Sequence, residues 1–218
     1  MRIQSKTASL VWKALIVVIG LVGIAIGSGM LSGNLDPRAF QMFTTLSNLL
    51  AIVYFFMALV VLGARGNGAP TFAPMVKQIV TMGVTVTFLI AHFMLFNLLF
   101  TDGVLNVDML ILHYIVPIMS ILDWLLFDEK GKMPAFAPFA WLVLPIIYLA
   151  ASEVAVNVCG LSVGLDSSTH GYPYPFLDAV SLGWPRVIGF ICLMVAAFLA
   201  LGYVWRAIDS LLARAGRK

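Results

Sequence analysis

The stretch LHYIVPIMSILDWLLFDEK, residues 112–130, is apolar enough to be a membrane helix, yet it contains the ionisable residue His113. A membrane helix needs about 20 mainly apolar residues, because the hydrocarbon layer is about 30 Å thick. An ionisable side chain at that depth is costly, and its presence points to a functional site. The stretch therefore predicts a membrane protein and indicates where its function lies.

The composition of the whole chain agrees with this prediction. Of its 218 residues, 61% are hydrophobic and only 11% are charged, which excludes a soluble domain. The formal net charge of +3 is too small to indicate a nucleic-acid partner. Two cysteines, Cys159 and Cys192, do not make a disulfide framework.

Six apolar runs predict an all-α membrane protein, folded as a single six-helix transmembrane bundle. Asp36-Pro37 is typical of a helix start, and Trp184-Pro185 is similar. The longest connection is an outer loop over residues 158–183. The expected helices cover approximately residues 11–31, 38–63, 75–100, 106–127, 136–157 and 184–207.

Lysine and arginine are divided unequally between the two sides that six spans define. The side with both termini, together with its flanking turns, holds eleven of the 13, and the other side holds only Arg38 and Arg186. Cytoplasmic segments carry the excess of Lys and Arg in membrane proteins. The sequence therefore predicts that both termini are cytoplasmic.

This topology converts sequence positions into depths. At about 1.5 Å per residue, Thr44 and His113 lie roughly 11 Å from the outer ends of their helices. His92 lies about 12 Å from the outer end of its helix, and Glu153 about 6 Å. Four polar groups from four helices are thus expected in the outer half of the bundle. Asp123, about 15 Å deeper than His113, is expected to be a separate, structural feature.

Two local patterns refine this picture. Thr44, Ser47 and Asn48 form one polar stripe on their helix, because they are spaced i, i+3 and i+4. Pro117 lacks a backbone N–H, so it is expected to free the carbonyl of His113, which then needs a partner. A purely structural explanation also exists, since Ser, Thr and Asn commonly bond to carbonyls or to neighbouring helices.

The residues alone leave three function classes open. A Thr44 hydroxyl with a nearby imidazole base is suited to nucleophilic acyl transfer. His92 and His113, at similar depth, suit haem or metal ligation in a membrane oxidoreductase. A transporter of small molecules or lipids is the third class, although the chain shows no duplicated pattern of broken helices.

Three segments together resemble a known family: FTTLSNLL (43–50), LHYIVPIMSILDWLLFD (112–128) and YPYPFLD (172–178). They resemble the prokaryotic branch of the androgen-induced, FAR-17a-like membrane proteins. Eukaryotic members of that family are threonine hydrolases that cleave fatty acid esters of hydroxy fatty acids. The resemblance implies a bacterial plasma-membrane hydrolase with Thr44 as nucleophile and His113 as its essential histidine. Thr45, the next residue, is a second candidate nucleophile.

We therefore expect a hydrolase that takes a lipid ester from the bilayer and needs no metal or other cofactor. Ser47, Asn48 or backbone groups are expected to support the oxyanion, with His92 and Glu153 as further polar groups of the pocket. The substrate cavity is expected to be lined by Met94, Phe96, Met119, Tyr174 and Phe176.

Overall fold

The computed structural model describes residues 2–65, 71–164 and 169–216. Within these ranges, six helical spans are long and apolar enough to cross a membrane, so the predicted number of spans is confirmed. They are α1 (Lys6–Gly27), α2 (Phe43–Ala64), α3 (Pro74–Met94), a unit from Val107 to Phe127, a unit from Ala137 to Asn157 and α9 (Trp184–Ala215).

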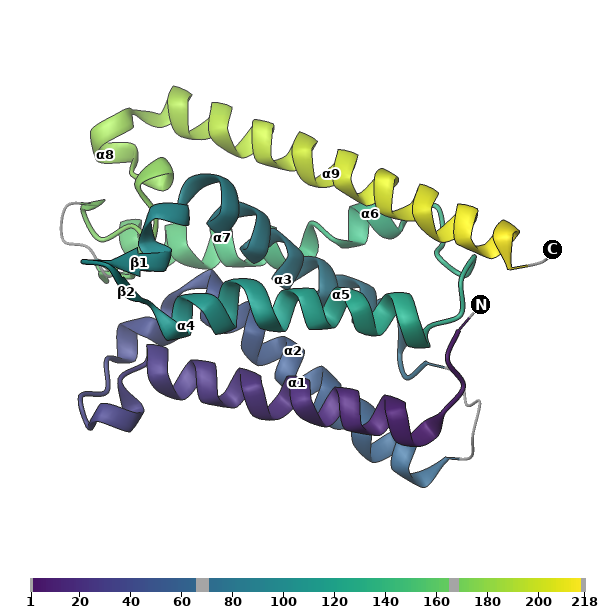
Figure 1. Cartoon of the computed structure of the whole chain (residues 1–218). Helices are drawn as coiled ribbons and strands as arrows, with labels where there is room; N and C mark the ends of the chain where they lie inside the picture. The colour runs from purple at the N-terminus through teal and green to yellow at the C-terminus, as the bar shows by residue number, and fades with distance from the viewer. Residues whose placement is uncertain (1, 66–70, 165–168, 217–218) are drawn as a thin grey trace.

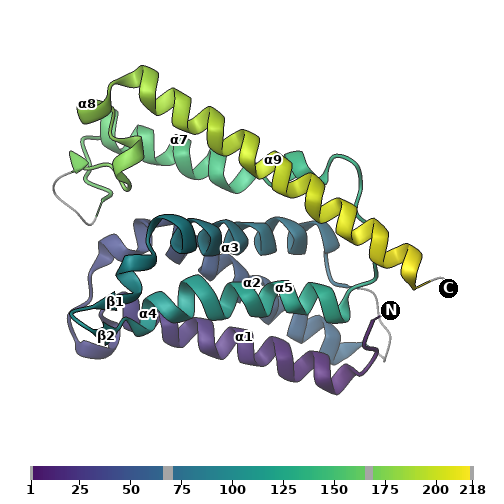
Figure 2. The same ribbon diagram turned by 45° about the horizontal axis from the view of Figure 1, so that its top comes forward.

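The helices form two groups. Helices α1, α2, α3 and α5 (Val116–Phe127) pack together as one group, and α7 (Val143–Asn157) and α9 form the second group, which lies against the outer face of α3 (Figure 2). Both termini lie at the same end of the bundle, which we call the basal end (Figure 1). The opposite, apical end carries the loop that contains residues 169–178.

Several short elements interrupt or connect the spans. These elements are η1 (Met30–Ser32), η2 (Pro37–Gln41), η3 (Phe96–Leu99), α4 (Val107–Leu110), the π-helical η4 (Ile111–Ile115), α6 (Ala137–Ala140), η6 (Pro175–Leu177) and α8 (Ala179–Leu182). The fifth span is interrupted between α6 and α7, because Pro145 has no N–H to donate to a carbonyl of the preceding turn.

The start of the second span differs from the prediction. Asp36 and Pro37 do begin a helix, but it is the short 3-10 helix η2, capped by the Asp36 carboxylate on the N–H of Arg38 at 3.0 Å. Met42 is then extended, and α2 begins at Phe43 instead of residue 38. Thr44 therefore lies in the first turn of α2, not two turns into it.

The end of the third span was also predicted wrongly. Helix α3 ends at Met94 instead of residue 100, and the chain continues into a hairpin of β1 (Phe100–Thr101) and β2 (Val104–Leu105). Asp102 and Gly103 form its turn with φ of 51° and 77°, and Asp-Gly is a strong signal for such a turn. At the other spans, α1 runs over 6–27 instead of 11–31, and α9 continues to residue 215.

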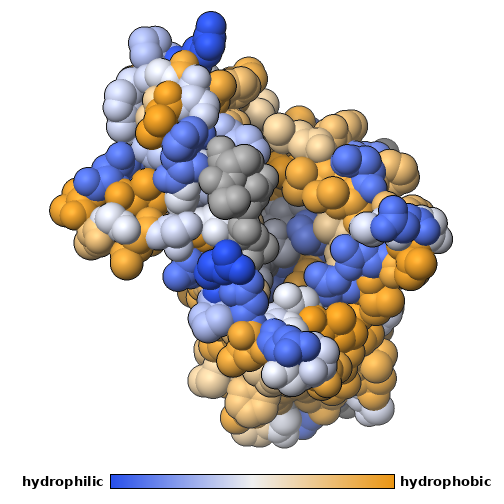
Figure 3. Space-filling view, turned by 90° about the vertical axis from the view of Figure 1, so that its left-hand side faces the viewer, coloured by the Kyte–Doolittle hydropathy of each residue, from blue (hydrophilic) through white to orange (hydrophobic). Residues whose placement is uncertain are grey.

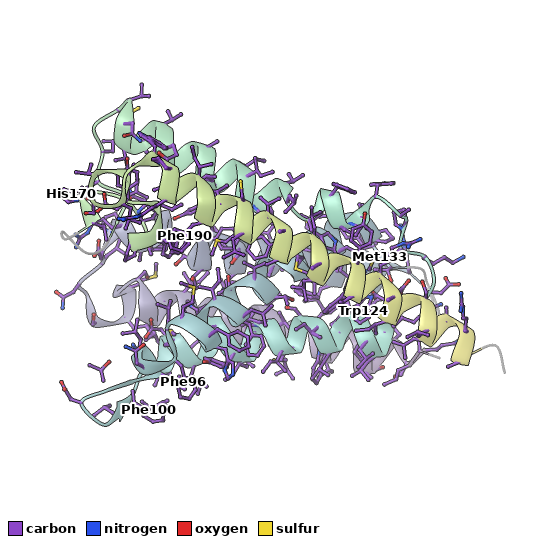
Figure 4. All side chains as sticks on the ribbon, turned by 90° about the horizontal axis from the view of Figure 1, so that it is seen from above. Phe96, Phe100, Trp124, Met133, His170 and Phe190 are labelled. Carbon is purple, nitrogen blue, oxygen red and sulfur yellow. The ribbon has the colours of Figure 1, made fainter. Side chains whose placement is uncertain are left out.

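Aromatic packing fixes α9 to the rest of the bundle. Trp205 of α9 lies against Trp124 of α5, with ring centroids 4.4 Å apart, and its edge meets Trp141 at 6.0 Å. All three indoles are buried. Trp124 lies towards the basal end of the bundle (Figure 4), so this cluster attaches the basal half of α9 to α5.

Four charged side chains meet in the basal half of the bundle. Asp123 of α5 accepts from Lys13 of α1 at 2.7 Å and from Lys77 of α3, and Lys77 also binds Asp128 at 2.6 Å. All four residues are buried. The two carboxylates balance the two ammonium groups, which lowers the cost of burying charge in an apolar bundle.

This network changes the interpretation of two residues. Lys13 and Lys77 were counted among the charges of the side with the termini, but both are inside the bundle and paired. Nine of the eleven remain on that side against two, so the asymmetry persists. The structural role expected for Asp123 agrees with its place between the two lysines.

Replacing Asp123 by asparagine tests the network. Asp123→Asn leaves two buried lysines with one carboxylate, and we expect a loss of about 3–5 kcal/mol in the free energy of unfolding. Unfolding in mixed detergent micelles measures it. The control is Glu129→Gln, which breaks the exposed 3.7 Å pair with Lys132 and costs about 0–1 kcal/mol. Equal losses in the two variants would contradict the assignment.

Candidate active site

Thr44 lies at the apical N-terminus of α2. The N-cap residue Met42 contributes no side-chain hydrogen bond to the helix. The first N–H groups of a helix have no acceptor within it, and the helix dipole makes this end positive. The hydroxyl of Thr44 is therefore placed where a developing negative charge is stabilised.

His113 lies on the π turn η4, at the same end of the bundle. The turn pairs the N–H of Val116 with the carbonyl of Ile111, five residues earlier. The same spacing would pair the Leu112 carbonyl with Pro117, which has no N–H. The carbonyl of Leu112 therefore needs a partner from outside its helix, whereas the sequence had pointed to the carbonyl of His113.

Thr44 and His113 meet directly. The distance from Thr44 Oγ1 to His113 Nε2 is 3.1 Å, and His113 Nδ1 lies 3.2 Å from the carbonyl oxygen of Met109. A carbonyl only accepts, so Nδ1 carries the ring proton and Nε2 is left to accept the proton of the Thr44 hydroxyl. The Met109 carbonyl therefore fixes the tautomer that a general base requires.

Asn48 holds the two halves of this pair together. Its side-chain Nδ2 donates to the carbonyl of Thr44 at 2.9 Å and to the carbonyl of Leu112 at 3.0 Å. One fully buried amide thus joins α2 to η4 beside both reactive side chains and satisfies the carbonyl that Pro117 leaves free. Gly23 of α1 lets the turn lie close, because a Cβ there would come within 2.5 Å of Ile111.

An apolar cavity of about 110 Å³ extends from Thr44 and His113 between α3, α7 and α9. Among the residues that the structure describes, the polar ones in its lining are Thr44, Thr87, His113, Tyr148 and Tyr174. Figure 3 looks onto the apical end, where hydrophilic side chains gather around a hollow and hydrophobic ones cover the flanks. The apolar walls include Val86 and Ile90 of α3, Leu149 of α7, and Ile191, Met194 and Phe198 of α9.

The apical loop closes the cavity beside Thr44. Tyr174 and Phe176 stack with ring centroids 5.3 Å apart, and Tyr174 also lies against Tyr148 of α7 at 6.3 Å. Tyr148 donates to the carbonyl of Gln41 at 3.1 Å. The predicted cavity residues Tyr174 and Phe176 therefore do line it, together with Tyr148, which sequence reasoning missed.

The loop is held by a cluster around Asp178. One carboxylate oxygen accepts from the N–H groups of Val180 and Ser181 at 3.0 and 3.1 Å, which caps α8. The other accepts from the Ser181 hydroxyl at 2.6 Å and lies 2.9 Å from Nδ1 of His170. Burial raises the pKa of Asp178, but the hydrogen bonds from Ser181 and His170 outweigh it and lower the pKa to about 2.

Other predicted polar residues lie outside the cavity lining. Ser47 bonds to the carbonyl of Thr44 and to Thr87, and Asn48 is occupied as described, so neither side chain is aimed at the cavity. Thr45 is buried beside them and does not line the cavity. These positions disagree with the prediction that Ser47 or Asn48 supports an oxyanion through its side chain.

His92 and Glu153 also lie away from the cavity. Because α3 ends at Met94, His92 is in its last turn, where its exposed ring stacks on Phe88 at 6.0 Å. Glu153 accepts from Asn157 at 2.8 Å and is outside the lining. The structure thus does not bring either residue to Thr44.

Three residues that were predicted to line the cavity do not line it: Met94, Phe96 and Met119. Met94 and Phe96 are each 53% exposed on the outside of the bundle, because the helix that was expected to continue past them ends. Met119 packs against the core of α1, α2 and α5. In Figure 4, Phe96 and His170 lie at opposite edges of the apical end. The walls come instead from α3, α7 and α9, and no local signal in the sequence pairs α7 and α9 with Thr44.

Replacing Asn48 tests its role as a clamp. Asn48→Leu leaves the carbonyls of Thr44 and Leu112 without this donor, and we expect a loss of about 1–3 kcal/mol in the free energy of unfolding. Ser47→Ala is the matched control, because it removes a hydroxyl bonded to the same Thr44 carbonyl while Asn48 remains. It should cost no more than about 1 kcal/mol in the same unfolding assay. A larger loss in Ser47→Ala would contradict the clamp.

The Asp178 cluster predicts acid sensitivity of the apical loop. A lowered pKa in the folded state means that Asp178 contributes stability above pH 3.8, its ordinary pKa, and loses it as the pH falls towards 2. The protection of segment 169–182 against hydrogen exchange, relative to the intrinsic exchange rate at each pH, should therefore fall over this interval. In Asp178→Asn the loop should exchange faster at neutral pH and lack this change. Identical pH profiles in the two proteins would exclude the assignment.

Comparison with protein-family models, with curated proteins and with solved structures finds no match for this chain. The geometry of the site is therefore the main support for a function, and the resemblance noted in the sequence is an additional argument.

Proposed function

We propose that the protein is an intramembrane threonine hydrolase that cleaves lipid esters. The observation that carries this proposal is the 3.1 Å contact between Thr44 Oγ1 and His113 Nε2 at the polar end of an apolar cavity. A nucleophile, a base in the accepting tautomer and a group that orients the base are the parts that acyl transfer needs.

The reaction proceeds in two halves. Thr44 Oγ1 adds to the ester carbonyl while His113 Nε2 takes its proton, and the imidazolium then gives that proton to the leaving alcohol. Water next attacks the acyl carbon while His113 takes its proton, and the imidazolium returns that proton to Thr44 Oγ1 as the C–O bond to Thr44 breaks and the fatty acid leaves. The N–H groups at the start of α2 favour the negative charge in both steps.

The cavity favours a substrate whose ester group carries an apolar acyl chain. Its single polar end positions the ester, and its walls between α3, α7 and α9 are apolar. We infer from the excess of lysine and arginine on the side with the termini that this side is cytoplasmic and that the site opens to the outer leaflet of a bacterial plasma membrane. Fatty acid esters of hydroxy fatty acids are the specific substrates that the sequence resemblance favours.

The alternative of paired haem or metal ligands has less support from the geometry. Both ring nitrogens of His113 already have hydrogen-bond partners, Thr44 and the Met109 carbonyl. His92 is held among aromatic rings and lies outside the cavity lining. Ligation by this pair would require His113 to lose a bond that defines the site.

Variants of the reactive pair test the proposal. In purified protein, Thr44→Ala should reduce ester hydrolysis to background, and His113→Gln should lower kcat by about 10²–10⁴-fold, because the base is lost. A fluorophosphonate probe should label wild-type protein at Thr44. Thr45→Ala and His92→Ala should retain most of the activity, since neither side chain lines the cavity.

Three results would argue against the proposal. Full activity of folded Thr44→Ala would exclude Thr44 as nucleophile. Loss of activity on treatment with a chelator would point to a metal, and a Soret band in purified protein would favour haem. Folding of each variant is checked by its thermal transition, so that inactivity is not confused with unfolding.

A further inference from the structure

Tyr174 brings a further polar group, its phenol hydroxyl, to the part of the cavity that Thr44 lines. Tyr174 lines the cavity together with Thr44, Phe43 and Tyr148, and its phenol lies close to the side chains of Thr44 and Tyr148 and to the backbone of Phe43. Its ring is fixed on one side by stacking on Phe176, with the two planes within 2° of parallel. The phenol thus lies at the cavity end that Thr44 lines, which an ester carbonyl must enter to reach the Thr44 hydroxyl.

A hydrolase of this kind needs a donor for the oxyanion, and the side chains first expected to supply it are occupied. The Ser47 hydroxyl donates to the Thr44 carbonyl at 3.1 Å, and Asn48 uses its amide nitrogen on two carbonyls. Phenol hydroxyls serve in oxyanion holes, because they donate strongly and are held by a rigid ring. Among the described polar residues that line the cavity, Tyr174 has a phenol close to the Thr44 side chain.

We propose that Tyr174 is a catalytic residue whose hydroxyl donates a hydrogen bond to the oxyanion formed when Thr44 adds to the ester. This inference rests on the proposed hydrolase function. As the Thr44 oxygen bonds to the carbonyl carbon, the electron pair of the C=O bond moves onto oxygen, and the Thr44 proton goes to His113. Tyr174 keeps its own proton throughout, and the oxyanion returns to a carbonyl when the alcohol leaves.

The environment of Tyr174 keeps this donor protonated. Burial raises the pKa of the Tyr174 hydroxyl above its ordinary value, so the group remains neutral through the alkaline range in which an ester hydrolase is assayed. The positive end of the α2 dipole lies at the same end of the cavity, because Thr44 is in the first turn of that helix. The phenol and the helix terminus then share the developing charge.

Tyr174→Phe is the direct test, because it keeps the ring and its stacking on Phe176 and removes only the hydroxyl. We expect kcat for a medium-chain p-nitrophenyl ester to fall about 10²-fold, with little change in KM. An unchanged kcat in the folded variant would overturn the inference. A raised KM with unchanged kcat would also overturn it, since the hydroxyl would then act only in ground-state binding.

Tyr172→Phe is the matched control from the same loop. The Tyr172 hydroxyl donates to Asn157 Oδ1 at 2.9 Å, and the residue is buried but does not line the cavity. This variant measures what the loss of a structural phenol does to the loop. It should lower the Tm and leave kcat close to that of the wild type. An equal drop in kcat in both variants would show that Tyr174 acts only through the loop.

An alkylboronic acid gives a readout that a structural role would not move. It forms a tetrahedral anion on a nucleophilic hydroxyl and so imitates the oxyanion. Its affinity should fall at least tenfold in Tyr174→Phe, whereas the affinity for a neutral amide analogue with the same chain should not change. If the two affinities fall together, the inference is wrong.

The same series separates this inference from the proposed function. A wild-type protein that neither hydrolyses esters nor reacts with the fluorophosphonate at Thr44 contradicts the hydrolase itself. An active wild type with an unaffected Tyr174→Phe contradicts only the role of Tyr174. If Tyr174→Phe does not fold, 3-fluorotyrosine at position 174 replaces it, because it keeps the hydroxyl and makes it a stronger donor. Boronate affinity should then rise, and an unchanged affinity would overturn the inference.

Discussion

Charge that is buried in an apolar bundle must be balanced, and this constraint organises the basal half of the molecule. Asp123 receives one lysine from α1 and another from α3, so these helices are fixed to α5 at a single point. Moving any of the three helices away would leave an ion without its partner, which costs far more than a lost apolar contact. The relative positions of α1, α3 and α5 follow from this pairing.

The apical half depends on a backbone defect instead of on charge. Pro117 and the π turn before it leave the Leu112 carbonyl without a helical donor, and Asn48 supplies one from α2. A helix with regular hydrogen bonds would have no such need, so the defect is what draws α2 against η4. Irregular backbone at membrane depth is tolerated where the protein itself satisfies it. The contact between Thr44 and His113 is a consequence of this repair.

The sequence predicted the large features and failed where contacts are long-range. Apolar length gave six spans, and the polar residues Thr44 and His113 were placed at the same depth even though α2 begins later than expected. That error was harmless because the 3-10 helix η2 takes up the residues before Phe43. The end of α3 was missed because apolar residues continue past Met94, and only Asp102-Gly103 signals the hairpin.

The lining of the cavity was harder to predict for a physical reason. Periodicity shows which face of a helix is polar, but α7 and α9 are apolar around most of their circumference, so no face is distinguished. Which of their side chains meet Thr44 is decided by packing against distant residues such as Trp124. Tyr148 and Tyr174 belong to this class, since their pairing joins two segments that no local pattern relates.

The residues of the proposed reaction and the apolar walls of the cavity lie on different helices, which affects how the substrate preference of such a protein can change. Under the proposed function, the nucleophile and the base belong to α2 and η4, whereas α9 contributes apolar walls such as Ile191, Met194 and Phe198. Substitutions along that one helix change the length and shape of the chain that fits, and they leave the chemistry untouched. Selectivity for the acyl chain and reactivity would then depend on separate segments of the chain, so that a new lipid preference can evolve through substitutions in α9 while Thr44 and His113 stay unchanged.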